Sequence, residues 1–414
     1  MICGDFMCRK MRYKNKFTRQ EDEMSEKTKS KQTAIVHSDY VPPAGFSAFP
    51  PAIYHASTVI FDTVDALRSR EWIGRDAYTY GLHGTPTTFT LEAQLAAIEG
   101  GKHCVLAPSG LAAITIVDMA FLKTGDDVLI PENIYNPNRE LGNWLSNDFG
   151  ISVRYYDPLI GAGIADLIKP NTRLIWAETP GSITMEVPDI PAFCKAAHER
   201  GVIVAVDNTW SAGLVFDAFG HGADIVVQAV TKYQAGASDL LMGAVISRDD
   251  ELNRKINMAH MRLGMGVGPD DTYLVLRSLA SMKVRFEKSG ESSMIVANWL
   301  KQRPEISKIL HPAFPDCPGH DIFRRDFTGT GGLFSVLFDE RYTEAQTDRF
   351  LEALKLFKMG FSWGGTHSLS VPYRIRPDRK DWNQRQHQLV RFYIGLEDTA
   401  DLIADLEQAL AVLG

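Results

Sequence analysis

Residues 202–233 read VIVAVDNTWSAGLVFDAFGHGADIVVQAVTKY and contain two short apolar runs, each followed by a charged residue. The first run ends at Asp207, and the second is followed by Lys232. Runs of this length predict consecutive buried strands. A buried charge needs a partner, because its desolvation is costly. The two residues therefore indicate either an ordinary ion pair or a site for pyridoxal 5'-phosphate (PLP), in which Lys232 forms a Schiff base and Asp207 keeps the pyridine nitrogen protonated.

Composition narrows the classes of protein that the chain can belong to. With 414 residues, 45% of them hydrophobic and 23% charged, it predicts a globular protein with a large core and two domains. A net charge of −7 argues against a nucleic-acid partner. No apolar run reaches the roughly 18 residues of a membrane span. The five cysteines form no CxxC pair, which predicts a cytoplasmic protein without a disulfide framework or a metal site.

Helical and strand patterns alternate from about residue 87 onward. The sequence predicts helices over residues 91–99 and 111–122, and strands over residues 104–106, 127–130, 153–156, 174–177, 203–206 and 225–229. This alternation is typical of an α/β fold with a mainly parallel, doubly wound sheet. Beyond residue 272 the pattern predicts a smaller α+β C-terminal domain, with helices at 273–300 and 398–413 and strands at 332–338 and 390–394. Residues 1–35 are expected to form a disordered basic tail, with Met24 as an alternative start.

Several residues at predicted strand ends could bind a ligand. Ser109 and Gly110 open a helix directly after a strand, which suits either a bound phosphate or a simple helix cap. Tyr135 follows another strand and could stack on a planar ring or lie on the surface. Thr209 and Thr231 flank Asp207 and Lys232, where they could donate hydrogen bonds to a ligand or cap the strand ends.

Two further features point to an anionic ligand. Arg391 lies within the apolar run LVRFYI, and a buried guanidinium needs an acid, either a substrate carboxylate or a structural Asp or Glu. Ser362-Trp363-Gly364-Gly365 is a loop whose glycines allow a close backbone approach or a tight turn. Parallel sheets bind ligands at their carboxyl edge, so these groups together predict one site.

Longer motifs give the chain a resemblance to a known family. They are Tyr80-Gly81…Gly84-Thr85-Pro86-Thr87, Pro180-Gly181-Ser182, Asp207-Asn208-Thr209-Trp210 and Thr231-Lys232-Tyr233…Ser238-Asp239. From about Tyr54 to the C-terminus the chain resembles the Cys/Met-metabolism family of PLP enzymes. The segments Asp157–Gly161, Gly181–Glu186, Arg325–Gly329, Ser362–Gly365 and Ile394–Asp398 resemble its bacterial cystathionine β-lyases. The resemblance implies the type I PLP fold of the aspartate aminotransferase class and a homotetramer built from catalytic dimers.

The resemblance also implies roles for individual residues. Lys232 is the Schiff-base lysine and proton shuttle, Asp207 the pyridinium partner and Tyr135 the ring that stacks on PLP. Ser109, Gly110, Leu111, Thr209 and Thr231 line the phosphate and ring; Arg391, Ser362, Trp363 and Tyr135 contact the substrate. Tyr80, in an arm formed by residues 36–86, reaches the phosphate of the neighbouring subunit. Residues 87–275 form the PLP-binding domain and residues 276–414 the C-terminal domain.

One departure from the family concerns the phosphate. The family usually has an arginine two residues after the tyrosine of the arm, where this chain has Leu82 followed by His83. His83, the Ser109-Gly110 helix terminus or a basic residue of the arm such as Arg75 is expected to compensate.

The resemblance implies a carbon–sulfur β-lyase that converts L-cystathionine to L-homocysteine, pyruvate and ammonia in methionine biosynthesis. Phe361 favours β- over γ-elimination, because γ-acting members typically have a glutamate at this position. The alternatives are a γ-synthase, γ-lyase or sulfhydrylase of the same family, an aminotransferase, or a regulatory protein that keeps the fold.

Overall fold

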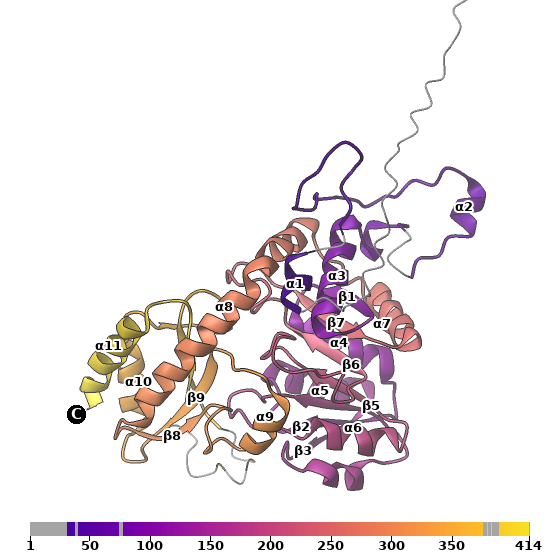
Figure 1. Cartoon of the computed structure of the whole chain (residues 1–414). Helices are drawn as coiled ribbons and strands as arrows, with labels where there is room; N and C mark the ends of the chain where they lie inside the picture. Colours follow the sequence, from indigo (N-terminus) through magenta and orange to yellow (C-terminus); the bar gives the residue numbers. More distant parts are fainter. Residues whose placement is uncertain are drawn as a thin grey trace, which may run out of the picture.

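The computed structural model describes residues 31–37, 40–73, 78–375, 379, 382 and 389–413. Two β-sheets lie side by side, and the long helix α8 (Pro269–Lys301) runs between them (Figure 1). The arrangement is the predicted α/β fold, with a larger sheet in the first part of the chain and a smaller one in the second.

The larger sheet has seven strands in the order β1-β7-β6-β5-β4-β2-β3. Their bounds are β1 (His103–Ala107), β2 (Asp127–Pro131), β3 (Ser152–Tyr156), β4 (Thr172–Glu178), β5 (Ile203–Asp207), β6 (Ile225–Gln228) and β7 (Gly243–Ser247). Strands β2 to β6 pair in parallel, as predicted, whereas β7 is antiparallel to both β6 and β1. The sequence did not predict β7, since its first residues, Gly243 and Ala244, have little strand propensity.

Both faces of the larger sheet are buried. On β4, Leu174 and Trp176 pack in one apolar cluster, while Ile175 and Ala177 pack in another on the opposite face. This alternation follows from the pleat of a strand. The first face is covered by α4 (Gly110–Phe121), α5 (Asn136–Phe149) and α7 (Asp250–Leu263), and the second by α3 (Pro86–Glu99), α6 (Ile190–His198) and α8. The sheet is therefore doubly wound.

Local sequence signals explain where the helices beside β1 begin and end. Thr85 caps α3 in a reciprocal capping box with Thr88, and Gly100 ends it in the left-handed conformation. Ser109, in extended conformation, caps α4, and its hydroxyl accepts from the Ala112 N–H at 3.0 Å. The start of α4 is thereby fixed at the end of the turn that follows β1.

The smaller sheet has five strands in the order β10-β11-β12-β9-β8. They are β8 (Ile306–Leu310), β9 (Leu333–Phe338), β10 (Lys358–Met359), β11 (Leu369–Tyr373) and β12 (Leu389–Tyr393). The second half of α8 packs against this sheet with α10 (Glu344–Ala353) and α11 (Thr399–Leu410), and α9 (His320–Asp326) lies towards the larger sheet (Figure 1). The smaller α+β unit predicted for the C-terminal part is confirmed.

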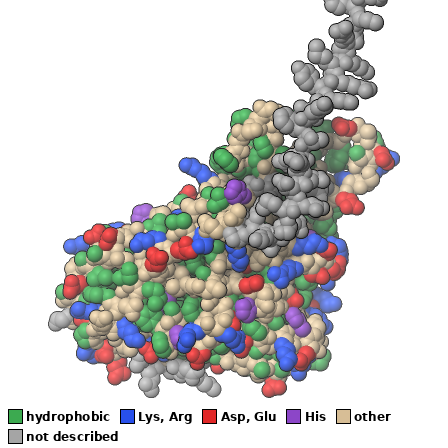
Figure 2. All heavy atoms as spheres, in the orientation of Figure 1, with side chains coloured by type: hydrophobic (Ala, Val, Ile, Leu, Met, Phe, Trp, Pro, Cys, Tyr) green, Lys and Arg blue, Asp and Glu red, His purple; other side chains and the backbone are tan. Residues whose placement is uncertain are grey.

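The N-terminal segment differs from the rest of the molecule. Helix α1 (Lys31–Val36) packs on the body through Ile35, so residues 31–35, expected to belong to a disordered tail, are helical; residues 1–30 lie outside the described part. Residues 40–73, which include α2 (Val64–Arg68), stand away from both sheets (Figure 1). Large apolar side chains are exposed there (Figure 2), and Phe49 is 95% exposed.

The last residues of the arm return to the main body of the molecule just before α3. Tyr80 forms a β-bridge with Thr58 and precedes the short 3-10 helix η1 (Gly81–His83). A Cβ atom on Gly81 would lie 1.9 Å from the carbonyl oxygen of Ala56, so this crossing requires glycine.

No helix in the described part of the chain is both long and apolar enough to cross a membrane.

Most strand positions of the larger sheet agree with the prediction to within one or two residues. Lys232 is an exception in detail: β6 ends at Gln228, and Lys232 lies in the turn that follows, four residues beyond the strand.

Candidate active site

Charged and polar side chains gather at the carboxyl edge of the larger sheet. Asp207 is the last residue of β5, Glu178 the last of β4, and Tyr135 follows β2 as the residue before α5. Lys232 lies in the turn after β6, and Ser109 in the turn after β1. Because parallel strands end at the same edge, residues distant in the sequence meet here.

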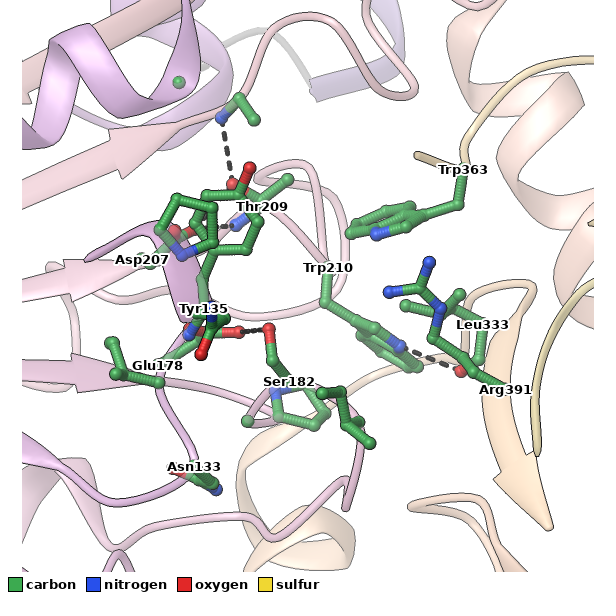
Figure 3. Close-up of a pocket in the computed structure, with 18 of the residues that line it drawn as sticks. Asn133, Tyr135, Glu178, Ser182, Asp207, Thr209, Trp210, Leu333, Trp363 and Arg391 are labelled. Atoms are coloured by element: carbon green, nitrogen blue, oxygen red, sulfur yellow. Dashed lines mark hydrogen bonds between the residues drawn. The ribbon is translucent and has the colours of Figure 1, made fainter. Parts of the chain in front are cut away.

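These side chains line one cavity of about 800 Å³. Figure 3 shows Asp207, Tyr135 and Glu178 on one side of it and Trp363 and Arg391 on the other. Every predicted site residue except Tyr80 lines the cavity: Ser109, Gly110, Leu111, Tyr135, Asp207, Thr209, Thr231, Lys232, Ser362, Trp363 and Arg391. Their individual roles stay predictions.

Lys232 contacts the loop Ser362–Gly365, which was noted in the sequence. Its Nζ donates to the Ser362 hydroxyl at 2.6 Å and lies 5.4 Å from the centre of the Trp363 ring. Gly364, at φ +87°, brings the loop so near that a Cβ there would lie 2.8 Å from the Lys232 carbonyl carbon. Burial, with a smaller contribution from Arg391, lowers the pKa of Lys232 to about 8. The amine is therefore easier to deprotonate than an exposed lysine.

Asp207 is held by its neighbour Thr209. One carboxylate oxygen accepts from the Thr209 N–H at 3.0 Å and from its hydroxyl at 2.5 Å. The Thr209 oxygen in turn accepts from the N–H of Ala229, the residue that follows β6. Burial raises the pKa of Asp207 although these hydrogen bonds oppose it. A cationic ring nitrogen nearby would favour the ionised form.

The start of α4 offers donors for a phosphate. Ser109 caps the helix, and the first N–H groups of a helix have no partner within it. A Cβ on Gly110 would lie 2.8 Å from the Cβ of Ala229, so glycine is needed for the close packing of this turn on the strand end. Thr231, beside it, pairs with the backbone of Met242 in both directions, at 2.9 and 3.2 Å.

Arg391 lies on β12 and faces the cavity from the smaller sheet. Its Nη2 approaches the Ser362 carbonyl at 3.5 Å, and its guanidinium lies 5.0 Å from the centre of the Tyr373 ring. Among the described residues no carboxylate forms an ion pair with it. Burial lowers its pKa. Of the two partners that the sequence left open, a structural Asp or Glu is not found in the described part of the chain. A ligand carboxylate would supply that partner.

Glu178 also belongs to the site, although it was not among the residues predicted from the sequence. Its Oε2 accepts from the Tyr135 N–H at 2.7 Å and its Oε1 from the Ser182 hydroxyl at 2.5 Å. Burial, and then the charge of Asp207 on the next strand, raise its pKa to about 8. Glu178 thus ties the loop of Tyr135 to the loop after β4. The signal that identified Asp207, a carboxylate closing an apolar run, was present here as well.

Tyr80 lies apart from the cavity. It lines a separate hollow of about 380 Å³ together with Arg70 and His83 of the same segment. Burial and then Arg70 lower the pKa of His83, which makes it a poor replacement for the cation missing at Leu82. Arg75 lies outside the described residues. Whether Tyr80 reaches a neighbouring subunit stays a prediction.

The cavity as a whole fits PLP. An amine with a lowered pKa, a carboxylate at the adjacent strand end and a helix terminus for a phosphate meet around one space. Lys232 would attach the cofactor, Asp207 would face its ring nitrogen and the start of α4 would hold its phosphate. In the described part of the chain, no group of three His, Cys, Asp or Glu side chains is arranged to hold a metal ion.

Comparisons with known proteins find similar proteins along most of the chain. The putative cystathionine beta-lyase of Rhizobium johnstonii is 40% identical over 364 residues, 87% of this chain and 91% of that protein. The cystathionine beta-lyase of Haemophilus influenzae is 38% identical over 91% of this chain and 96% of its own length. The crystal structure of metB from Corynebacterium glutamicum superimposes with a TM-score of 0.84 at 30% identity, covering 94% of this chain and 99% of that one.

A family model matches nearly the whole chain. It is described as Cys/Met metabolism PLP-dependent enzyme, and it matches residues 32–411. The match includes both sheets and every residue of the cavity described above. The chain belongs to the Cys/Met metabolism family of PLP-dependent enzymes.

Proposed function

We propose that the protein is a PLP-dependent carbon–sulfur β-lyase that cleaves L-cystathionine to L-homocysteine, pyruvate and ammonia, a step of methionine biosynthesis. The observation that carries this proposal is Arg391, a partly buried guanidinium that shares a cavity with Lys232 and has no carboxylate partner in the described part of the chain. The α-carboxylate of an amino-acid substrate would complete it. Relatives named cystathionine beta-lyase support the choice of reaction.

The chain's own residues account for the steps that need a protein group. Arg391 binds the α-carboxylate and thereby orients the substrate towards Lys232. When bound, PLP supplies an electron-withdrawing ring that stabilises negative charge at the substrate's α-carbon. Asp207 would hold a proton on the ring nitrogen, and the Tyr135 ring would lie against the cofactor ring. Lys232 Nζ accepts the α-proton, which its lowered pKa favours near neutral pH. The Cβ–S bond then breaks, and the sulfur leaves as the thiol with a proton that Lys232 Nζ can return to it. Water releases the remaining three-carbon unit as pyruvate and ammonia.

The cavity wall favours elimination at the β-carbon. Phe361 precedes Ser362 in the loop that contacts Lys232, and its side chain is 80% exposed at the cavity. An apolar ring at this position offers no carboxylate near the substrate's more distant carbons. We therefore propose β- rather than γ-elimination.

Product analysis tests the function directly. The purified holoenzyme is incubated with L-cystathionine, and pyruvate and α-ketobutyrate are quantified separately, with the Lys232→Ala variant as background. Pyruvate and homocysteine should dominate. Dominant α-ketobutyrate would indicate γ-elimination and would overturn the proposal.

We further propose a homotetramer of catalytic dimers in the cytoplasm. The exposed apolar side chains of the arm, among them Phe46, Phe49 and Ile60, suit burial against a second copy of the chain. Tyr80 would then contact the cofactor phosphate of the neighbouring subunit. Cys104, Cys194 and Cys317 are buried, and the sequence has no CxxC pair that would indicate a disulfide framework. A mass measured by light scattering tests the assembly, and a monomer at micromolar concentration would contradict it.

A further inference from the structure

A group of buried polar side chains lies beside the active site and has no role in the proposed reaction. Its members are Glu99, which ends α3, Asn208, which follows β5, Gln228, which ends β6, and Gln234, in the turn after β6. Each is at most 3% exposed. None of the four lines the cavity, so no contact with a substrate explains why these polar groups are buried there.

The group is joined to the active site through direct neighbours in the sequence. Asn208 stands between Asp207 and Thr209, which both line the cavity, although Asn208 itself does not. Gln234 comes two residues after Lys232, in the same turn. The buried group is therefore in contact with the backbone on both sides of the space proposed for PLP.

Gln228 connects these two sides. Its Nε2 donates to the backbone carbonyl of Asn208 at 3.0 Å and also to Oε1 of Glu99. Its Oε1 accepts from Gln234 Nε2 at 2.9 Å. Because a backbone carbonyl only accepts, the orientation of the Gln228 amide is fixed. The turn that contains Lys232 is thereby tied to the end of β5.

The amide of Asn208 is fixed in the same way. Its Nδ2 donates to the Phe216 carbonyl at 3.3 Å and to Oε2 of Glu99 at 3.0 Å, and its Oδ1 accepts from the Ser211 hydroxyl. Burial raises the pKa of Glu99 to about 7, although the bonds from the two amides and the charge of Lys31 oppose this. An N–H thus faces each oxygen of Glu99, an arrangement that suits a carboxylate, because it only accepts.

We propose that Glu99 is a positioning residue, which sets the place of Asp207 relative to Lys232. It acts through the amides of Asn208 and Gln228, which it holds together from behind the two strand ends. Asp207 is proposed to face the ring nitrogen of PLP and Lys232 to attach the cofactor, so the inference rests on the proposed function. Two groups that contact one rigid ring at different atoms must be held at a fixed separation.

Glu99→Gln tests this role. Glutamine has the shape of glutamate, but in either orientation its amide nitrogen meets another N–H₂ group, since neither neighbouring amide can turn without losing a backbone contact. The dissociation constant of PLP should rise about tenfold, as measured by dialysis of the holoenzyme against a series of PLP concentrations.

The visible absorbance of bound PLP gives a second measurement on the same variant. Its change with pH reports the proton on the bond between Lys232 and the cofactor. If Asp207 is displaced, the ring nitrogen is less protonated, and a less positive ring lets that proton be held more tightly. The midpoint of the absorbance change should therefore move to higher pH in Glu99→Gln.

Two further variants complete the experiment. Asp405→Asn is the matched control, because Asp405 is a buried carboxylate outside the cavity that accepts from the backbone N–H groups of residues 355–357. It should lower the melting temperature and leave both PLP measurements as in the parent. Gln234→Met removes only the link to the turn of Lys232 and should raise the dissociation constant about threefold. It decides the question if Glu99→Gln does not fold.

A Glu99→Gln variant that melts at a lower temperature but keeps the parental PLP affinity and absorbance would show that the group only supports the fold. That result would overturn the positioning role, as would parental PLP binding in Gln234→Met when Glu99→Gln does not fold. Neither PLP measurement involves a substrate, so both decide the proposal whatever reaction the enzyme catalyses. Failure of the proposed function appears separately, as missing pyruvate when the parent enzyme is given cystathionine.

Discussion

Charged side chains lie at both edges of the larger sheet, and the two edges differ in how these charges are paired. At the amino edge, Asp127 of β2 accepts two hydrogen bonds from Arg154, at 2.6 and 2.7 Å, and further ones from Ser152 and Thr172. Although burial raises its pKa, these contacts hold it below the ordinary value. At the carboxyl edge, burial raises the pKa of Asp207 and lowers that of Lys232. The charge at the amino edge is paired within the chain, whereas the charges at the carboxyl edge are expected to be paired by a ligand.

This difference in pairing indicates that the charges at the amino edge contribute to stability and those around the carboxyl edge to function. Asp127 and Arg154 satisfy each other, so their contribution is to the folded state. Arg391, which faces the carboxyl edge, has no acid partner in the described part of the chain, and its burial is a cost that a substrate can relieve. Substitutions at the carboxyl edge should therefore affect turnover, and substitutions at the amino edge should affect unfolding.

The largest effect is expected at Lys232. Lys232→Ala would remove both the amine proposed to attach the cofactor and the group proposed to accept the α-proton, so turnover should fall by more than about a thousandfold. Pyruvate release by the purified variant, with its PLP content measured in parallel, checks this. Lys283→Ala, at an exposed lysine paired with Glu287 on α8, is the control and should keep parental turnover. Near-parental activity of Lys232→Ala would show that another group does this work.

Arg391→Met should act almost entirely on the substrate. Losing a charge-assisted contact with the α-carboxylate should reduce kcat/KM about a hundredfold. The melting temperature should not fall, because no acid in the described part of the chain loses a partner. Steady-state kinetics and thermal unfolding of the same preparation test both statements. A large loss of stability with unchanged kcat/KM would place Arg391 with the structural charges instead.

Arg154→Met should show the reverse. It leaves the buried carboxylate of Asp127 with only Ser152 and Thr172, and we expect a loss of about 2 kcal/mol in the free energy of unfolding. KM for cystathionine should stay within about twofold of the parent, since Arg154 does not line the cavity. Denaturant unfolding and kinetics measure the two quantities. If KM rises with no change in stability, the amino edge also contributes to function, and the proposed difference between the two edges is wrong.

Much of the carboxyl edge could be predicted from local sequence. Asp207 and Lys232 each follow an apolar run, and the strand period alone predicts where such runs end. Arg391 stood out for a similar reason, as one charge within an apolar strand. The same reasoning could have identified Glu178, which closes the run of β4.

The contacts of Arg379, which also lines the cavity, could not be predicted in this way. Arg379 and Glu186 are 193 residues apart in the chain, and neither stands in a pattern that marks it. The antiparallel placement of β7 is equally non-local, because it depends on pairing with both β1 and β6.

The smallest effect is expected at Glu178, which lies between the two classes of charge. It is buried like Asp127 but its pKa is raised, to about 8, by burial and then by Asp207. The protonated form is therefore more favoured than in an exposed glutamate. Glutamine has the same shape and can accept from the Tyr135 N–H while its amide donates to the Ser182 oxygen. Glu178→Gln should keep turnover at neutral pH within about threefold of the parent.

The pH dependence of stability is the sharper test of Glu178. A carboxyl group whose pKa is higher in the folded than in the unfolded state binds its proton more tightly when folded. Its contribution to stability is complete below its ordinary pKa of 4.5 and is lost as the pH rises through about 8. The parent should therefore lose stability relative to Glu178→Gln as the pH rises across this interval. Unfolding of both holoenzymes, measured as a function of pH, should show the free-energy difference moving steadily in favour of the variant. Parallel curves would mean that Glu178 is ionised throughout, like Asp127, and that the carboxyl edge is less different from the amino edge than its geometry indicates.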